Sequence, residues 1–416
     1  MKLDESYCSI GQALSYYENI LELLPQDDAH AYLRRMQDLA ANPDRITDFS
    51  QEDCYRTSLM RENGAQRALE DGTDLIIGKI LATELRFSFR TSTGGEQFES
   101  TFIFGDSTDI PSRINAVIGY NGAGKTRLLA NLAHVAWGDE HHRRNSLSHG
   151  ELRPRNLAFG RVVAVSYSAF DMFDTPTSDA AKRAYVYCGL RDLNVPSQHK
   201  LKGQNVIADE IEAAVTRLKS SSRWQMLRRA LEPLLREPSF RLSAGEMNFQ
   251  DEPDTWRPGF DSLSTGHKIS LNIVVQLVTQ LENRSLVLLD EPETHLHPPL
   301  LAALMTGIAV ALEETNSFAV VATHSPVVLQ EIAKRHVQVI RRSGTATIIE
   351  IPPMETFGES IGVLTRTVFN LDNADSDHEG TLAALAKTHG TERINEVFPE
   401  GLSSQALGIL LQNEID

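Results

Sequence analysis

The sequence predicts an α/β fold with a mixed central sheet flanked by helices, and three apolar runs predict it. Residues 114–118, 286–289 and 318–322 each have the length of a strand buried on both faces, and all are apolar apart from Asn115. A stretch with helical periodicity, residues 127–136, follows the first of these runs. Such sheets bind their ligands at the carboxyl ends of the strands. We therefore expect the functional residues at one edge of this sheet.

A glycine-rich loop lies between the first strand and its helix, and it matches the pattern G-x-x-x-x-G-K-[ST]. Its glycines leave room for consecutive backbone N–H groups to point at one anion, and the helix dipole adds positive potential. We expect the catalytic Lys125 to contact the β- and γ-phosphates and Thr126 to offer its hydroxyl to Mg²⁺. The predicted nucleotide contacts are Gly119, Asn121, Gly122, Ala123, Gly124, Lys125, Thr126 and Arg127.

Polar residues also follow the other two strands. Asp290 and Glu291 come directly after residues 286–289. We expect Asp290 to hold the Mg²⁺ shell and Glu291 to act as a general base on the water that attacks the γ-phosphate. A core strand that ends in a solvated acidic turn is the plain alternative. His324 follows the third strand, where it either hydrogen-bonds a γ-phosphate or is satisfied within a turn.

A second candidate anion site precedes the apolar helix predicted over residues 269–281. Ser264 and Gly266 stand in the run Leu-Ser-Thr-Gly-His-Lys just before that helix. A serine and a glycine at a helix N-terminus can bind an anion, but an ordinary N-cap explains them as well. The sequence leaves both interpretations open.

Taken in order, these four elements resemble the ABC-type P-loop ATPase family, in the branch of OLD-like and DNA-repair heads, over roughly residues 75–345. The resemblance implies an ATP hydrolase that uses Mg²⁺ and forms homo-oligomers through a head-to-head ATP sandwich. It implies that Ser264 and Gly266 close over the nucleotide of a second protomer. It also implies that His324 is a switch and that residues 290–298 line the interface between heads.

One departure from the family concerns the strand after the phosphate-binding helix, residues 161–165. The glutamine that usually follows this strand in the family is absent here. Ser168 or Asp171 takes the metal-side role, or the segment is a plain loop. The sequence does not decide between these alternatives.

Composition narrows the class of protein. The 416 residues carry 40 basic and 56 acidic side chains, a net charge of −16, which disfavours binding of nucleic acid over the whole surface but leaves a local patch open. Three scattered cysteines predict neither a disulfide framework nor a zinc knuckle. With no signal peptide and no membrane-spanning run, we expect a cytoplasmic protein that does not contact a membrane.

The pattern along the chain predicts three parts. Residues 1–72 form an N-terminal helical segment, which docks on its own body or on a partner. Residues 73–350 form the ATPase domain with a helical insertion at about 176–245, and residues 351–416 form a C-terminal helical extension. Within the domain we expect strands at 75–81, 84–90 and 98–104. Phe87 or Phe89 either stacks on adenine or packs in the core.

Three further sets of residues raise other chemistry. Basic residues around Trp224 can bind a nucleic-acid backbone and stack a base, or they are solvated helix faces; they are Arg217, Lys219, Arg223, Arg228 and Arg229. The pairs His141-His142 and His295/His297 suggest a metal site, but we expect none. Asp375 and Asp377 are better interpreted as a solvated loop than as nuclease carboxylates, because too little chain follows for a toprim domain.

Residues 167–173, 185–190 and 355–364 are similar to segments of the ATPase subunit of Septu anti-phage systems. This resemblance implies an ATPase that senses a trigger or restrains a separate HNH-type nuclease, because no nuclease motif is visible in this chain. Two other functions stay open: a DNA-repair head that clamps DNA, and a nucleotide-gated scaffold with little hydrolysis. Contact with DNA or RNA is left open in each case.

Overall fold

The structure is a computed structural model. It describes residues 3–60, 63–77, 84–138, 140–155, 157–168, 171–174, 179–192, 201–244, 249, 253–368, 380–382, 384–385, 396–404, 406–408 and 410. The chain divides into two compact units, residues 1–358 and 359–416. All of the predicted site residues lie in the larger unit. The domain limits that the sequence predicts at residues 72 and 350 stay a prediction.

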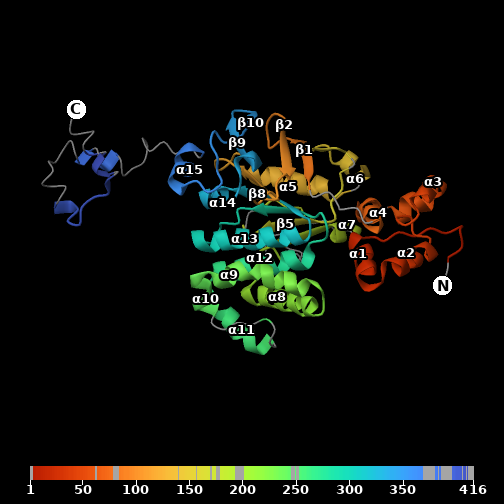
Figure 1. Cartoon of the computed structure of the whole chain (residues 1–416). Coiled ribbons are helices and arrows are strands. Elements are labelled where there is room, and N and C mark those ends of the chain that lie inside the picture. The colour runs from red at the N-terminus through yellow and green to blue at the C-terminus, as the bar shows by residue number, and fades with distance from the viewer. Residues whose placement is uncertain are drawn as a thin grey trace. The chain divides into compact units, whose positions relative to one another are not determined.

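A mixed sheet forms the centre of the larger unit (Figure 1). Its strand order is β10-β9-β3-β8-β7-β5-β6, with only the β9–β10 pair antiparallel. This arrangement confirms the predicted fold class. The strands are β3 (Ile114–Ile118), β5 (Val162–Ser166), β6 (Tyr185–Gly189), β7 (Leu286–Asp290), β8 (Phe318–Thr323), β9 (Val337–Ser343) and β10 (Ala346–Glu350).

The register of the parallel strands brings their carboxyl ends together. Every residue of β3, β5, β7 and β8 is buried, as expected for strands covered on both faces. Ile118 pairs with Thr323, and Asp290 pairs with both Ala322 and Ser166. The phosphate loop, the acid pair and His324 therefore leave the sheet at the same edge.

A small antiparallel sheet and one helix cover one face of the central sheet. The small sheet has the order β2-β1-β4, and the helix is α5 (Lys125–Ala136), which contacts β7 and β8 as well as β1 and β4. Phe87 and Phe89 are 1% and 0% exposed in the shared core, so neither can stack on adenine. The strands are β1 (Leu85–Thr91), β2 (Phe98–Phe104) and β4 (Glu151–Arg153).

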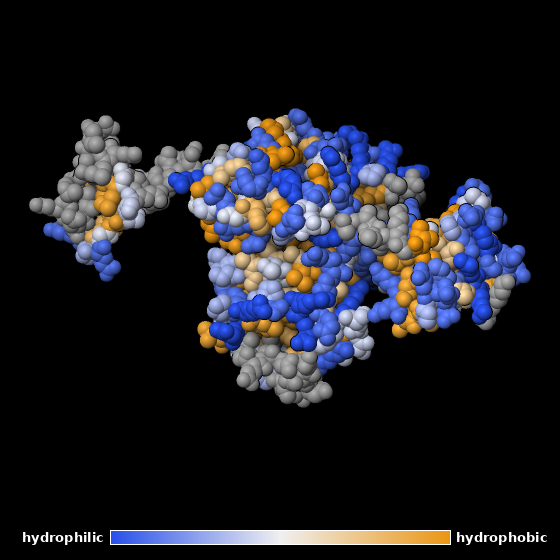
Figure 2. Space-filling model, in the orientation of Figure 1, coloured by the Kyte–Doolittle hydropathy of each residue, from blue (hydrophilic) through white to orange (hydrophobic). Residues whose placement is uncertain are grey.

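Helices cover the other face and continue into a helical layer farther from the sheet (Figure 1). Helix α12 contacts β5 and β6, and α9 packs on both α12 and α13. Figure 2 shows mostly hydrophilic side chains on the face of the helical layer seen there. The helices of this side are α8 (Gln204–Lys219), α9 (Arg223–Arg236), α10 (Pro238–Ala244), α11 (Pro253–Ser262), α12 (Thr265–Gln280) and α13 (Pro298–Glu314).

The span predicted as a helical insertion begins differently. Residues 185–189, inside the predicted limits of about 176–245, form the edge strand β6, because their apolar side chains pair alongside β5 and are mostly buried. The helical layer itself starts at α8. The remaining short elements of this unit are α6 (Glu140–Asn145), α7 (Asp179–Ala184), α14 (Pro326–Gln330) and the 3₁₀ turn η3 (Lys334–His336).

The N-terminal helices have a core of their own. Tyr17, fully buried, receives a hydrogen bond from the Gly11 amide (2.9 Å) and donates to buried Asp38 (3.0 Å). The strand predicted at 75–81 is wrong at its start, because residues 75–76 end α4, and residues 78–83 lie outside the described residues. The elements are α1 (Leu14–Leu23), α2 (Gln26–Arg35), η1 (Pro43–Arg45), α3 (Ile46–Phe49), the π-helical turn η2 (Tyr55–Leu59) and α4 (Asn63–Ile76).

The smaller unit contains α15 (Ile361–Thr367) and a small apolar cluster around Leu382 and Leu410. The acidic pair Asp375 and Asp377 lies outside the described residues. Among the helices that the structure describes in either unit, none combines the length and the apolar character needed to cross a membrane.

Candidate nucleotide-binding site

The phosphate loop has the backbone that an anion cradle requires. Gly122 and Gly124 have φ of 80° and 99°, in the left-handed region that favours glycine. A Cβ on Gly119 would stand 2.5 Å from the Ile340 carbonyl oxygen, so no larger residue fits where β3 enters the loop. A Cβ on Gly124 would stand 2.6 Å from the Thr93 hydroxyl. The glycines therefore leave room for a ligand on one side of the loop and let the other side pack closely against Ile340 and Thr93.

Helix α5 begins at the end of this loop and carries the predicted cation. Lys125 is 5% exposed, and its ammonium donates to the Gly119 carbonyl at 2.9 Å. The first amides of a helix have no partner inside the helix, so they are available to an anion. Of the other predicted contacts, Asn121 and Arg127 are exposed and Ala123 is buried.

Thr126 and Asp290 meet across the gap between loop and sheet. The Thr126 hydroxyl donates to Asp290 Oδ1 at 2.9 Å. Burial raises the pKa of Asp290 to about 7; the Thr126 hydrogen bond opposes this, and the charges of Glu291 and Asp171 add to it. A hydroxyl and a carboxylate at this distance are the hard oxygen ligands that Mg²⁺ prefers, so these residues fit the predicted ion.

Glu291 follows Asp290 in a strained conformation. Its φ is 49°, which is uncommon for a residue with a side chain. Such strained conformations are found most often at functional sites. Its amide donates to the Ala322 carbonyl at 2.9 Å, which ties the end of β7 to β8. Its side chain is 30% exposed, and Oε1 lies 3.8 Å from His324 Nδ1. The carboxylate is thus accessible to water beside the loop.

Glu293 holds the segment that carries His324, and sequence reasoning missed this role. One oxygen, Oε1, accepts from the Thr323 hydroxyl at 2.8 Å and from the His324 amide at 2.8 Å. The same oxygen lies 3.2 Å from His324 Nδ1. The carboxylate thus fixes the backbone of His324 and lies beside its ring. The sequence signal that could have indicated this role is that Glu293 is a third acidic residue in the turn, two positions after Glu291.

The loop after β5 supplies one more carboxylate to this edge. Of the two residues left open by the sequence, Asp171 is the one whose charge acts on Asp290. Its fully buried carboxylate pairs with Arg191 at 2.7 Å and accepts from the Tyr187 hydroxyl at 2.6 Å. Tyr187 and Arg191 were not predicted, since they belong to or follow β6, an edge strand recognisable only as an apolar run.

The Leu-Ser-x-Gly stretch lies at the start of α12. Ser264 is exposed, and its hydroxyl accepts from the His267 amide at 3.3 Å, so within one chain it is an N-cap. Gly266 is buried, and a Cβ there would stand 2.5 Å from the His295 carbonyl oxygen. Farther along α12, Asn272 donates to the Tyr167 hydroxyl at 2.8 Å, next to the end of β5. The helix is thus attached to the strand beside Asp290.

His297 belongs to a polar cluster, but its hydrogen positions oppose a metal site. The Ser239 hydroxyl lies 3.0 Å from His267 Nε2, 2.8 Å from His297 Nε2 and 2.6 Å from Glu237, and these groups could surround an ion. However, His297 Nδ1 accepts the Leu300 amide (3.3 Å), which places the ring hydrogen on Nε2. The lone pair that a metal would need is therefore absent, and a hydrogen-bond network fits better.

A second cluster joins His134, His149 and Asp174. The rings of His134 and His149 stack with centroids 3.9 Å apart and planes 17° from parallel. Imidazole lone pairs lie in the ring plane, so the two rings cannot both point at one ion in this arrangement. His141 of the predicted pairs is not described at side-chain level, and His295 is in neither cluster.

The chain is similar to several known proteins. Residues 189–330 match the family model described as "AAA domain, putative AbiEii toxin, Type IV TA system". Among solved structures, a putative metal-chelate type ABC transporter is 16% identical over 64% of this chain and 83% of its own, with a TM-score of 0.33. UvrA2 from Deinococcus radiodurans is 16% identical over 65% of this chain and 38% of its own, with a TM-score of 0.32.

A curated relative covers almost the whole chain. Protein ea59 of Escherichia phage lambda is 32% identical over 412 residues, which are 92% of this chain and 78% of that protein. The alignment thus spans the phosphate loop, the acid pair and His324 together. The chain belongs to the family of protein ea59, and its residues 189–330 match the AAA domain model.

Proposed function

We propose that this protein binds ATP with Mg²⁺ and hydrolyses it to ADP and phosphate. The observation that carries the proposal is the meeting of three strand ends, those of β3, β7 and β8, at one sheet edge. There the glycine cradle, the Thr126–Asp290 pair, Glu291 and His324 converge. We expect the protein to act in the cytoplasm, where its substrate is plentiful.

Each residue has a stated task in this reaction. Lys125 exchanges the Gly119 carbonyl for the β- and γ-phosphates, and the first amides of α5 hold the same oxygens. Thr126 and Asp290 would hold Mg²⁺ in place of their mutual hydrogen bond, and the ion would neutralise charge on the phosphates. Glu291 accepts a proton from the attacking water. His324, whose backbone amide is held by Glu293, presents its ring to the γ-phosphate.

The second protomer completes the site. Ser264 is the exposed N-cap of a sixteen-residue helix, and its bond to the His267 amide leaves the hydroxyl hydrogen able to approach another chain's nucleotide. We therefore include a head-to-head homodimer in the proposal, with Ser264 and Gly266 sealing the partner's ATP. Larger assemblies can be built from such dimers.

The experiment that tests the proposal is a phosphate-release assay with purified protein. Wild type should hydrolyse ATP only with Mg²⁺ present. Lys125→Ala should lose ATP binding, whereas Glu291→Gln should bind ATP and turn over roughly 100- to 10,000-fold more slowly, as expected for a lost general base. Equal, negligible rates for wild type and Glu291→Gln, with ATP bound by both, would favour a nucleotide-gated scaffold instead.

The finer proposal is a role in anti-phage defence. It rests on the similarity of residues 167–173, 185–190 and 355–364 to the ATPase subunit of Septu systems. The ATPase would restrain an HNH-type nuclease carried on a separate chain. Pull-down of the protein with its genomic neighbour, with and without ATP, tests this. Recovery of no nuclease in either condition would reject the defence role and leave the ATPase proposal intact.

A further inference from the structure

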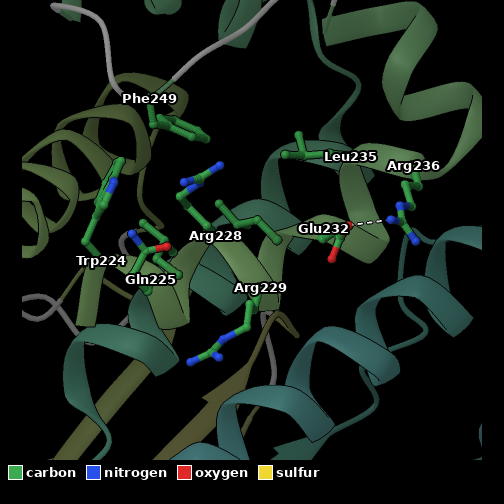
Figure 3. A pocket seen from close by; sticks show the side chains of 10 residues that line it. Trp224, Gln225, Arg228, Arg229, Glu232, Leu235, Arg236 and Phe249 are labelled. Carbon is green, nitrogen blue, oxygen red and sulfur yellow. Dashed lines mark hydrogen bonds and ion pairs between the residues drawn. The ribbon is translucent and has the colours of Figure 1, made fainter. Parts of the chain in front are cut away.

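The helical layer contains a cavity of about 640 Å³ along one side of α9 (Figure 3). This volume is in the range of roughly 300–1,000 Å³ typical of ligand sites. The cavity is distant in sequence from the phosphate loop and shares no lining residue with it. Its lining combines arginines with aromatic and aliphatic side chains: Trp224, Gln225, Leu227, Arg228, Arg229, Leu231, Glu232, Leu235, Arg236 and Phe249.

Helical spacing explains why these side chains share one surface. Trp224, Arg228 and Leu235 follow one ridge of α9, at steps of four and seven residues. Gln225, Arg229, Glu232 and Arg236 follow the neighbouring ridge. The opposite side of α9, including Ala230 and Leu234, packs into the protein and fixes the helix. The cavity wall is therefore held by a buried face and is not a loose surface segment.

The charges in the cavity are unequally paired. Arg229 forms two contacts with Glu314 of α13, at 2.6 and 2.8 Å, and Arg236 pairs with Glu232. Arg228 makes no ion pair or hydrogen bond with any residue that the structure describes. Three arginines face one lining glutamate, in a protein whose net charge is −16. An anion would give the Arg228 guanidinium the partner that it lacks.

Two aromatic side chains lie near that guanidinium. Figure 3 shows Phe249 above Arg228 and Trp224 to its left. Phe249 is fixed by an edge-to-face contact with Trp256, with ring centroids 5.1 Å apart and planes at 60°. In the described part of the chain, the indole N–H of Trp224 and the side-chain amide of Gln225 have no hydrogen-bond partner. An aromatic ligand with polar edges and an attached anion matches this set.

We propose that this cavity binds single-stranded nucleic acid, with a base stacked on Trp224 and the adjoining phosphate on Arg228. A base in a duplex is stacked on its neighbours and cannot enter such a cavity. The lining runs along α9 from Trp224 to Arg236, about 18 Å at 1.5 Å per residue, longer than one nucleotide. A nucleic-acid strand can contact both ends of this cavity at once, and a mononucleotide cannot.

This site goes beyond the ATPase function and does not depend on it. Helix α9 packs on α12, whose N-cap is Ser264, and on α13, which follows Glu293 and His297. A nucleic-acid strand bound along α9 would thus lie one helix away from the residues that approach a second protomer. The site needs no nucleotide in the phosphate loop.

Fluorescence anisotropy with a labelled twelve-nucleotide oligothymidylate tests the proposal on the full-length protein. Trp224→Ala should weaken binding roughly five- to 100-fold, the effect of losing one stacked base. Arg228→Ala should also weaken binding and reduce the slope of log Kd against log salt by about 0.7, the value for one lost phosphate contact on a single strand. Arg86→Ala, which removes an exposed arginine from β1, is the matched control and should bind as wild type does.

Further variants and ligands distinguish binding in this cavity from binding elsewhere on the protein. Lys125→Ala should keep oligonucleotide binding, and both cavity variants should keep wild-type melting temperatures and ATP turnover. Loss of binding in Lys125→Ala would place the strand in the phosphate loop and overturn the proposal. Equal affinity for thymidine monophosphate or for a hairpin duplex would overturn it too. So would an Arg86→Ala effect as large as that of Arg228→Ala, or no binding by wild type at low salt.

Discussion

Replacing Asp290 by asparagine should stabilise the nucleotide-free protein at alkaline pH. Burial raises the pKa of Asp290 from the ordinary 3.8 to about 7, so the folded state keeps a proton that the unfolded state has lost. Between about pH 4 and pH 7 the unfolded chain binds fewer protons at this group, so the free energy of unfolding falls as pH rises. Above pH 7 both states are ionised, and the penalty stays constant.

The gap between 3.8 and about 7 corresponds to a penalty on the order of 4 kcal/mol, at about 1.4 kcal/mol per pKa unit. The asparagine amide keeps an oxygen that can accept from Thr126, and it removes the charge. With a chelator and no nucleotide, Asp290→Asn should therefore denature at higher urea concentration than wild type at alkaline pH. At acidic pH, near 4, the two proteins should denature alike. Equilibrium urea denaturation followed by circular dichroism measures both.

Binding of Mg²⁺-ATP should change the relative stabilities of the two proteins in the opposite direction. At alkaline pH, saturating Mg²⁺-ATP should stabilise wild type by mass action and leave Asp290→Asn nearly unchanged, because the variant lacks the metal-binding carboxylate. Turnover of the variant should be lost. A stability difference between the two proteins that is the same at acidic and alkaline pH would refute the buried-charge argument, since a packing effect does not titrate.

Three other predictions concern the same edge of the sheet. Glu293→Ala should lower kcat at least tenfold with little change in KM, whereas Glu293→Gln should keep most activity, since its amide oxygen can still accept from the Thr323 hydroxyl and the His324 amide; equal losses contradict this. Ser264→Arg should abolish ATP-dependent dimerisation in size-exclusion chromatography but leave ATP binding intact. Arg191→Ala should cost roughly 3–5 kcal/mol in urea denaturation by stranding the Asp171 carboxylate, and Asp171→Asn in the same chain should recover most of it.

The sequence was enough to predict the central sheet and its acid pair for a physical reason. Strands buried on both faces are rich in apolar residues, and β3, β7 and β8 are apolar apart from Asn115 and the polar residues that end β7 and β8. The phosphate loop is contiguous, so its glycines, Lys125 and Thr126 could be identified from one short motif. Their positions at the carboxyl ends then follow from the parallel order.

Residues that meet only through the tertiary fold were out of reach. The Asp171–Arg191 pair joins two loops at the ends of β5 and β6, and neither residue has a local pattern that marks it. The strand predicted at 75–81 failed because a short apolar run does not distinguish a strand from the end of a helix. Residues 75 and 76 instead end α4, and buried Ile76 packs in the N-terminal core.

The hydrogen bond between Asn272 and Tyr167 has a mechanical consequence for a dimer. It fastens the helix that reaches toward a neighbour's nucleotide to the strand that ends beside this chain's own carboxylates. When α12 tilts to bind or release the neighbour's nucleotide, it must either move Tyr167 with it or break the hydrogen bond between Asn272 and Tyr167. Two active sites on separate chains would then turn over in concert, because each chain carries the helix that closes the other's site.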